Sequence, residues 1–121
     1  MKYAIQVNSG YTHTTLPHIA HQFITTALAE GHAIIRVFFY HDGIYNGFGL
    51  PSSSGTVNPN PDAPDWSALA ERHGVELVLC VTAAETRGLA ETALLPGFRL
   101  GGLGLWMDAC LRADRFMVFE G

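Results

Sequence analysis

Apolar residues along this chain either alternate with polar ones or recur every three to four residues, and the two spacings predict different elements. Alternation over residues 1–8, closed by a turn signal, predicts a first strand. Recurrence at helical spacing over 16–28 predicts a helix that begins after Thr15 and ends near Gly31. A nearly continuous apolar run over 34–40 predicts a strand covered on both faces, as strands of parallel sheets are.

The pattern dissolves into Gly, Pro, Ser and Asn over residues 41–64, and loops of this length are usually functional or disordered. Beyond the loop, the predicted elements are a helix over 66–73 stopped by Gly74, a strand over 75–80, an uneven helical stretch to Leu95, a short strand over 98–100, a helix from Leu103 with Trp106, Met107, Ala109, Cys110 and Ala113 inward, and a last strand over 115–119. This order predicts an α/β fold, with a mainly parallel sheet of about five strands between helical layers. We expect residues 1–121 to form a single domain.

The chain carries few charges for its size. Charged residues make up 15% of the 121 residues, where about 25% is usual in globular domains. A surface with so few charges leaves apolar area exposed, and large apolar patches seldom stay open to water. We therefore expect a subunit that covers part of its outside against other subunits.

The balance of the charges excludes several classes of function. The formal net charge is −4, and no run of Lys or Arg occurs. Direct binding of nucleic acid is disfavoured, because phosphates require a positive stripe. No apolar stretch is long enough for a helix that spans a membrane, and the amino terminus lacks the regions of a signal peptide. The cytoplasm is the expected compartment, in which both cysteines would be thiols.

The candidate ligand-binding and catalytic residues are expected at one edge of the predicted sheet, because the carboxyl ends of parallel strands all lie there. This edge should carry segment 8–13, segment 41–43 and, at the end of a third strand, Cys80. Among these residues, Cys80 is the nucleophile that needs least help, since a thiolate is reactive once it forms.

The residues after Cys80 bear on the charge of its sulfur. Thr82 and Glu85 have the spacing of a capping box, which predicts that a helix begins two residues beyond the sulfur. The partial positive charge of a helix start favours an anionic thiol. Arg87 lies within reach of the same turn and would add to this effect, whereas Glu85 would oppose it, so the sum of the two charges is left open.

Each cysteine also has a simpler interpretation. A cysteine that ends a strand is most often a small buried apolar residue, and this alternative holds for Cys80. Cys110 falls on the apolar side of the last predicted helix, where a core position is favoured. A role for Cys110 as a resolving thiol would require the two sulfurs to come close in space.

Two further kinds of site are weighed and set aside. His13, His18 and His21 lie near one another in sequence, but no acidic or thiol ligand is spaced with them, so no metal site is predicted. The hydroxyl-rich segment 8–15 precedes a helix and suits an anion, yet it lacks the glycines of a phosphate loop. A nucleotide- or flavin-binding module is therefore the weaker alternative, and no cofactor is predicted.

Several motifs together resemble one family over nearly the whole chain. They are the run Val37-Phe38-Phe39-Tyr40-His41-Asp42-Gly43 followed by Asn46, the strand end Cys80-Val81-Thr82-Ala83-Ala84, and Gly102-Leu103-Gly104 with Ala113-Asp114-Arg115 before the last strand. In this order they resemble the DsrE/TusD family of sulfur-relay proteins. The resemblance implies a flavodoxin-like three-layer α/β subunit that assembles with same-fold subunits, identical or paralogous, into a hexamer or trimer. Cys80 matches the family's active cysteine, and Arg87 matches one of the basic residues that follow it.

The resemblance also implies a mechanism. The Cys80 thiolate would take the outer sulfur of a donor protein's persulfide and pass it to an acceptor protein's thiol, in sulfur oxidation or in tRNA thiolation. Neither a metal nor an organic cofactor would be needed. Thr82 would support the anion through the helix start, while His41 or segment 8–13 would shape the entrance. A structural subunit of the same kind of assembly, with a merely packed Cys80, is the alternative.

Overall fold

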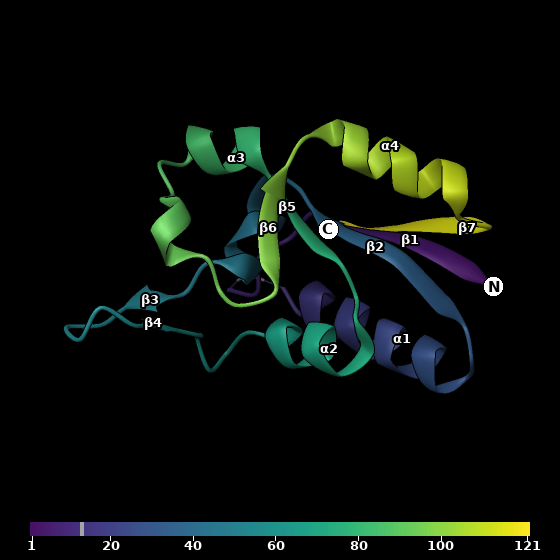
Figure 1. Cartoon of the computed structure of the whole chain (residues 1–121), viewed down its shortest axis with the longest axis horizontal. Coiled ribbons are helices and arrows are strands. Elements are labelled where there is room, and N and C mark those ends of the chain that lie inside the picture. Colours follow the sequence, from purple (N-terminus) through teal and green to yellow (C-terminus); the bar gives the residue numbers. More distant parts are fainter. Residues whose placement is uncertain (13) are drawn as a thin grey trace.

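Five parallel strands form one sheet, in the order β6-β5-β2-β1-β7 (Figure 1). The computed structural model describes residues 1–12 and 14–121, except for the side chain of Pro51. The strands of the sheet are β1 (Lys2–Val7), β2 (Ala33–Phe39), β5 (Leu77–Cys80), β6 (Phe98–Gly101) and β7 (Arg115–Phe119). The predicted α/β class and the predicted parallel sheet are confirmed.

Helices cover both faces of this sheet. In Figure 1, α1 (Leu16–Ala29) and α2 (Trp66–His73) lie together below the strands, and α4 (Leu103–Arg112) lies above them. The short α3 (Val81–Thr86) lies at the carboxyl edge, on the same side as α4. The three predicted layers are therefore present. In the described part of the chain, no helix is both long and apolar enough to cross a bilayer.

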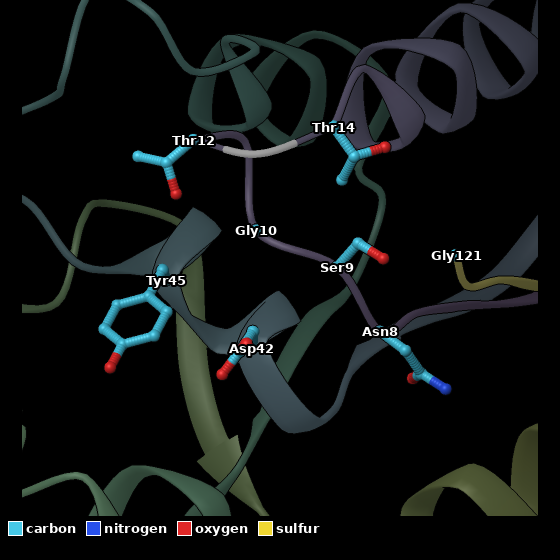
Figure 2. Close-up of a pocket in the computed structure, with 8 residues that line it drawn as sticks. All are labelled: Asn8, Ser9, Gly10, Thr12, Thr14, Asp42, Tyr45 and Gly121. Carbon is cyan, nitrogen blue, oxygen red and sulfur yellow. The ribbon is translucent and has the colours of Figure 1, made fainter.

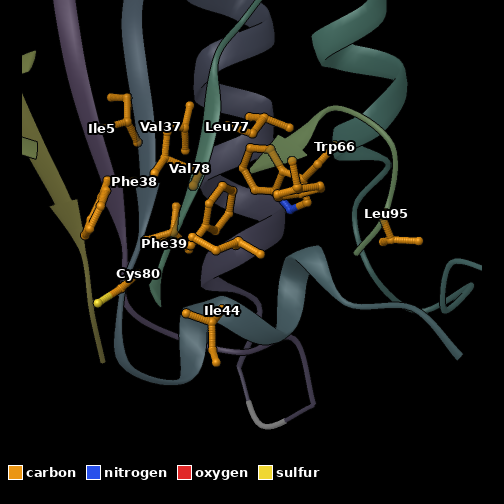
Figure 3. Packing of buried hydrophobic residues seen from close by; sticks show 14 of the residues in the cluster. Ile5, Val37, Phe38, Phe39, Ile44, Trp66, Leu77, Val78, Cys80 and Leu95 are labelled. Carbon is orange, nitrogen blue, oxygen red and sulfur yellow. The ribbon is translucent and has the colours of Figure 1, made fainter. Parts of the chain in front are cut away.

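The central strand β2 shows why its apolar run is nearly continuous. Successive side chains of a strand point to opposite faces, and both faces of β2 are covered. Phe39 packs edge-on against Trp66 of α2, with ring centroids 5.0 Å apart. Phe38 points the other way (Figure 3). Its ring centroid lies 6.4 Å from that of Trp106 in α4. The rings of Phe38 and Phe39 are fully buried.

Segment 41–64 is more regular than the sequence predicts. It contains a 3-10 helix, η1 (His41–Gly47), and a small hairpin of β3 (Leu50–Pro51) and β4 (Val57–Asn58). The buried amide of Asn46 holds η1 in place. Its nitrogen donates to the carbonyls of Ser9 and Gly43, and its oxygen accepts from the indole of Trp66. Because a polar side chain makes these contacts, no apolar spacing marks this segment.

Helix α4 is apolar on its outer side as well as on its inner side. Met107 was predicted to point inward, but the structure leaves it 58% exposed. Leu103 and Leu111 lie one turn away on either side and are also exposed, as are Phe116 and Val118 of the edge strand β7. We call these five residues the α4/β7 apolar surface. Of the other residues predicted to face inward, Ala109 is buried, and Trp106, Cys110 and Ala113 are half-buried.

A buried arginine ties α4 to the sheet. Arg36 of β2 is 5% exposed, and its guanidinium forms ion pairs with Glu76 and Asp108, each at 2.9 Å. It also donates to the carbonyl of Leu105 in α4. Arg99 pairs with Glu76, and Arg112 pairs with Asp108 across one helical turn. The network crosses from β6 to α4 and closes the apolar face around Phe38 and Trp106.

Candidate functional site

Cys80 is the last residue of β5 and lies at the carboxyl edge of the sheet, where the sequence places it. Helix α3 begins at the next residue, so Cys80 itself occupies the position before the helix. The predicted capping box is wrong, because the helix starts two residues earlier than the spacing of Thr82 and Glu85 requires. Thr82 lies inside the first turn, and its carbonyl accepts a hydrogen bond from the hydroxyl of Thr86.

The thiol of Cys80 is covered in the isolated chain. Only 2% of the residue is exposed, whereas exchange of sulfur with partner proteins would require an accessible thiol at the rim of the sheet. The side chain lies on the same side of the sheet as Phe38, opposite to Phe39 and Trp66 (Figure 3). This is the α4 side, and Cys80 belongs to the main core cluster. The burial agrees with the alternative of a packed cysteine. A partner protein could reach the sulfur only if some of the surrounding side chains moved.

Strand register identifies the neighbours of Cys80 on either side. Toward β6, it pairs with Gly101, which has no side chain. A Cβ at Gly101 would overlap Leu105 and Val78, so those two side chains already fill that flank. Toward β2, Leu79 pairs with Phe39, and the residues that follow each of them are therefore Cys80 and Tyr40. Tyr40 thus lies beside Cys80 on the same face of the sheet.

Tyr40 is stacked on His41, the predicted supporting residue. The two ring centroids lie 4.0 Å apart with planes at 26°, and the ring of Tyr40 also packs against Phe38 at 6.3 Å. His41 is exposed and has a φ of 49°, the left-handed region that residues with a side chain rarely adopt. Within the described chain, His41 is the one non-glycine residue with a positive φ. Such strain is characteristic of functional sites.

Arg87, the other predicted supporting residue at this edge, is paired with Asp42. Its guanidinium binds the Asp42 carboxylate, with Nε and Nη2 at 3.1 and 3.0 Å from Oδ1, and it donates to the carbonyl of Ala83. The positive charge is therefore directed at Asp42. The pair joins the end of α3 to η1, which are the two segments that directly follow β5 and β2.

Cys110 lies far along α4, which starts at the carboxyl edge and runs back across the sheet. Cys80 stays at that edge, so the two sulfurs are separated by most of the helix, and both cysteines are free thiols. Burial raises the pKa of the Cys110 thiol. The structure therefore does not bring Cys110 to Cys80 as a resolving partner.

The histidines considered for a metal have other surroundings. His21 contacts α2, with its Nε2 3.1 Å from the carbonyl of Asp65 and its ring edge-on to Trp66. His18 is exposed on α1, and His13 lies outside the described residues. Across residues 1–12 and 14–121, no group of three His, Cys, Asp or Glu side chains is placed to hold a metal ion.

A polar pocket of about 300 Å³ follows β1, where the sequence suggests an anion site (Figure 2). Of the described residues that line it, none is basic, and Asp42 contributes a carboxylate. The described residues of the lining are Asn8, Ser9, Gly10, Thr12, Thr14, Asp42, Tyr45 and Gly121. A carboxylate without a basic side chain disfavours a phosphate, so the nucleotide or flavin alternative gains no support.

Sequence reasoning missed Tyr40 as part of the site, and it placed Asp42 at the edge of the sheet without predicting its partner Arg87. Tyr40 and Asp42 both belong to segment 40–43 at the end of a predicted strand, next to the edge where the chemistry was expected. Tyr40 could have been found by aligning the ends of the two buried strands, because Cys80 closes one run and Tyr40 closes the other. The Asp42–Arg87 pair spans 45 residues, and no local spacing signals it.

Comparison with known proteins gives concordant results. The DsrE/DsrF-like family matches the chain over residues 1–119. A DsrE protein of Allochromatium vinosum is 38% identical over 133 residues, covering 98% of both chains. The sulfurtransferase TusD of Salmonella arizonae is also 38% identical, over 130 residues that cover 98% of this chain and all of that one. Among solved structures, the ychN protein of E. coli superposes with a TM-score of 0.74 at 20% identity, covering 98% of this chain and all of its own.

Proposed function

The chain belongs to the DsrE/DsrF-like family, and from that premise we propose that it is a sulfur-relay sulfurtransferase that carries sulfur on Cys80. The observation that carries the assignment to this residue is its position. Cys80 ends a buried strand of a parallel sheet, at the edge where such folds place their reacting groups, and a helix begins directly after it. The other thiol, Cys110, lies on the outer helix away from this edge.

The proposed reaction consists of two thiol exchanges. In the first, the Cys80 thiolate attacks the outer sulfur of a donor persulfide, the donor's S–S bond breaks, and the donor leaves as a thiolate. In the second, an acceptor thiolate attacks the outer sulfur of the Cys80 persulfide and restores the Cys80 thiolate. Each step forms one S–S bond and breaks one, so the relay needs no oxidant or reductant. The proposed partners are a persulfide donor protein and a thiol acceptor protein.

Other residues have supporting roles in this proposal. His41 shapes the entrance, because it is exposed and directly follows the strand beside β5. Arg87 fixes α3 against η1 through Asp42. Thr82 lies in the first turn of α3, whose start follows Cys80. We place the relay in the cytoplasm, where thiols persist, and its product in sulfur oxidation or tRNA thiolation.

The test of this function is direct sulfur loading. The protein is incubated with a persulfide donor and then weighed intact under non-reducing conditions. A carrier gains one sulfur atom, about 32 Da, and peptide mapping places that mass on the segment that contains Cys80. Absence of any sulfur adduct would contradict the proposal and favour the structural-subunit alternative.

We also propose that the chain assembles with subunits of the same fold, identical or paralogous, as a hexamer or trimer. The α4/β7 apolar surface supports this assembly. Leu111 is 83% exposed and Phe116 is 63% exposed, and β7 is an edge strand with one unpaired side. Exposed apolar area next to an open strand edge favours contact with another protein surface.

A charged residue introduced into the α4/β7 apolar surface is expected to dissociate the assembly. Leu111→Glu should shift size-exclusion and sedimentation profiles to smaller species, because a carboxylate would be buried in the contact without a partner. Arg72→Glu, which also places a carboxylate on an exposed helix position, is the control and should leave the profile unchanged. A wild-type protein that runs as a well-behaved monomer would contradict the assembly.

A further inference from the structure

We propose that the stacked pair of Tyr40 and His41 is a gate over the Cys80 thiol, so that opening of this pair limits access to the sulfur. The inference rests on the proposed function, because a gate matters only if Cys80 exchanges sulfur with partner proteins. It deepens that function by naming what covers the thiol and what must move.

The cover on the other side of Cys80 is fixed. Gly101 pairs with Cys80 there, and the side chains of Leu105 and Val78 fill the space that a Cβ of Gly101 would take. Leu105 belongs to α4, whose backbone is tied to the sheet by the buried guanidinium of Arg36. Movement of α4 on this flank would break the buried ion network, so this side of Cys80 stays closed.

The cover on the β2 side is made of aromatic rings, and neither Tyr40 nor His41 belongs to the ion network of Arg36. Tyr40 is half-buried beside Cys80, and its outer surface is closed by the imidazole of His41. His41 itself is exposed, so a docking protein reaches it without disturbing the core. An aromatic pair of this kind contributes only a modest free energy. This side is therefore the one that opens at low cost.

The backbone of His41 stores strain that favours movement. Its φ of 49° is unfavourable for a residue that carries a side chain. Contacts on the next residues hold it there: the amide of Gly43 donates to the carbonyl of Tyr40, and a Cβ on Gly43 would overlap the carbonyl oxygen of Val7. Release of His41 relieves this backbone strain while the contacts of Gly43 keep the rest of η1 in place, so the movement involves only Tyr40 and His41.

The pair of Arg87 and Asp42 limits how far the gate opens. Asp42 follows His41 directly, and Arg87 ends α3, which begins at the residue after Cys80. The two segments that leave the neighbouring strand ends of β2 and β5 are therefore joined to each other. A closed gate excludes water and small thiols from a sulfur in transit, and such exclusion suppresses side reactions.

The test measures how fast Cys80 reacts in the folded protein. All variants carry Cys110→Ser, so that only Cys80 is labelled, and iodoacetamide and a larger aromatic disulfide are used in parallel. His41→Gly and Tyr40→Ala are expected to speed labelling by roughly three- to tenfold, the range expected when one aromatic contact is removed. The larger reagent should gain more than the smaller one, because its entry requires a wider opening.

Two controls separate a gate from general loosening. Glycine adopts the backbone conformation of His41 without strain, so His41→Gly should label faster with no loss in the midpoint of urea unfolding. Tyr45→Ala removes an exposed ring from the same η1 segment, on the side of the polar pocket, and should label at the wild-type rate. Tyr40→Phe keeps the ring and should also remain at the wild-type rate.

The outcomes also separate the gate from the carrier function. Wild-type rates in both His41→Gly and Tyr40→Ala would overturn the gate, as would a wild-type thiol that already reacts as fast as a free cysteine. Faster labelling in both variants supports the gate even if no variant accepts sulfur, in which case the carrier function fails alone. Sulfur loading of wild type with unchanged labelling in both variants leaves the carrier function intact and refutes the gate.

Discussion

Cys80→Ser is expected to take up no sulfur from a persulfide donor, whereas Cys110→Ser should load as the wild type does. A serine hydroxyl is nearly isosteric with the thiol but cannot form a persulfide, so the first exchange has no acceptor atom. Cys110 offers no substitute, because it lies on the outer helix α4 and not at the carboxyl edge of the sheet. Intact mass under non-reducing conditions should show the gain of about 32 Da in Cys110→Ser and no gain in Cys80→Ser.

The paired substitutions make this result specific. Serine replaces cysteine in both variants, so any general effect of losing a thiol appears in each of them. Thermal unfolding and size exclusion should confirm that both variants fold and assemble like the wild type. If Cys80→Ser gained sulfur, or if Cys110→Ser failed to gain it, the assignment of the relay to Cys80 would be wrong. Wild type that never loads, together with slow alkylation, would identify Cys80 as a packed residue of a structural subunit.

The strands and helices of this chain were predictable because the core is built from regular apolar spacing. The run over 34–40 is apolar because both faces of β2 are covered, and the strand over 115–119 was placed at its observed bounds. The η1 segment was not predictable from spacing. Asn46 holds it through three hydrogen bonds to groups that lie far apart in sequence or belong to the segment itself. Polar contacts of this kind produce no regular spacing of apolar residues in the sequence.

The position of Cys80 was predictable, but its environment was not. The end of a strand in a parallel sheet is known once the strand is known, and this placed the sulfur at the edge. The residues that flank Cys80 across the sheet, Gly101 and Tyr40, lie 21 residues after it and 40 residues before it in the printed sequence, so no local pattern indicates its burial. The prediction that Met107 points inward was wrong for a related reason. Helix α4 has apolar residues on two sides, and spacing alone does not say which side meets the sheet.

Arg36→Ala is expected to lower the free energy of unfolding by about 3 kcal/mol, the lower end of the range for breaking a buried ion pair. The Arg36 side chain is 7% exposed, and its guanidinium binds two carboxylates and the carbonyl of Leu105, so the substitution removes every one of these contacts. The lower end applies because Glu76 and Asp108 are partly exposed and can be rehydrated, and because the buried Nε has no hydrogen-bond partner in the described structure.

Arg112→Ala is the matched control for this substitution. Arg112 also pairs with Asp108, but both side chains are about half exposed, and such pairs contribute about 0.5 kcal/mol or less. Urea unfolding of the two variants should therefore differ severalfold in the loss of stability. Equal losses would show that the network contributes as a surface pair does, and that α4 is held by its apolar contacts alone.

The same network should make stability fall in acid, and Arg36→Ala should weaken that fall. Burial raises the pKa of Glu76, but hydrogen bonds from Arg36 and Arg99 outweigh this effect and hold the pKa below its ordinary value. Hydrogen bonds from Arg36 and Arg112 lower the pKa of Asp108. A lowered folded-state pKa means that the unfolded chain binds more protons, so this contribution to stability is complete above about pH 5 and is lost as pH falls through the folded-state values. Without Arg36, both carboxyl groups titrate closer to their unfolded values.

The difference in unfolding free energy between wild type and Arg36→Ala should therefore shrink from pH 7 to pH 3. A difference that stays constant over this range would mean that the guanidinium acts by packing and not by charge.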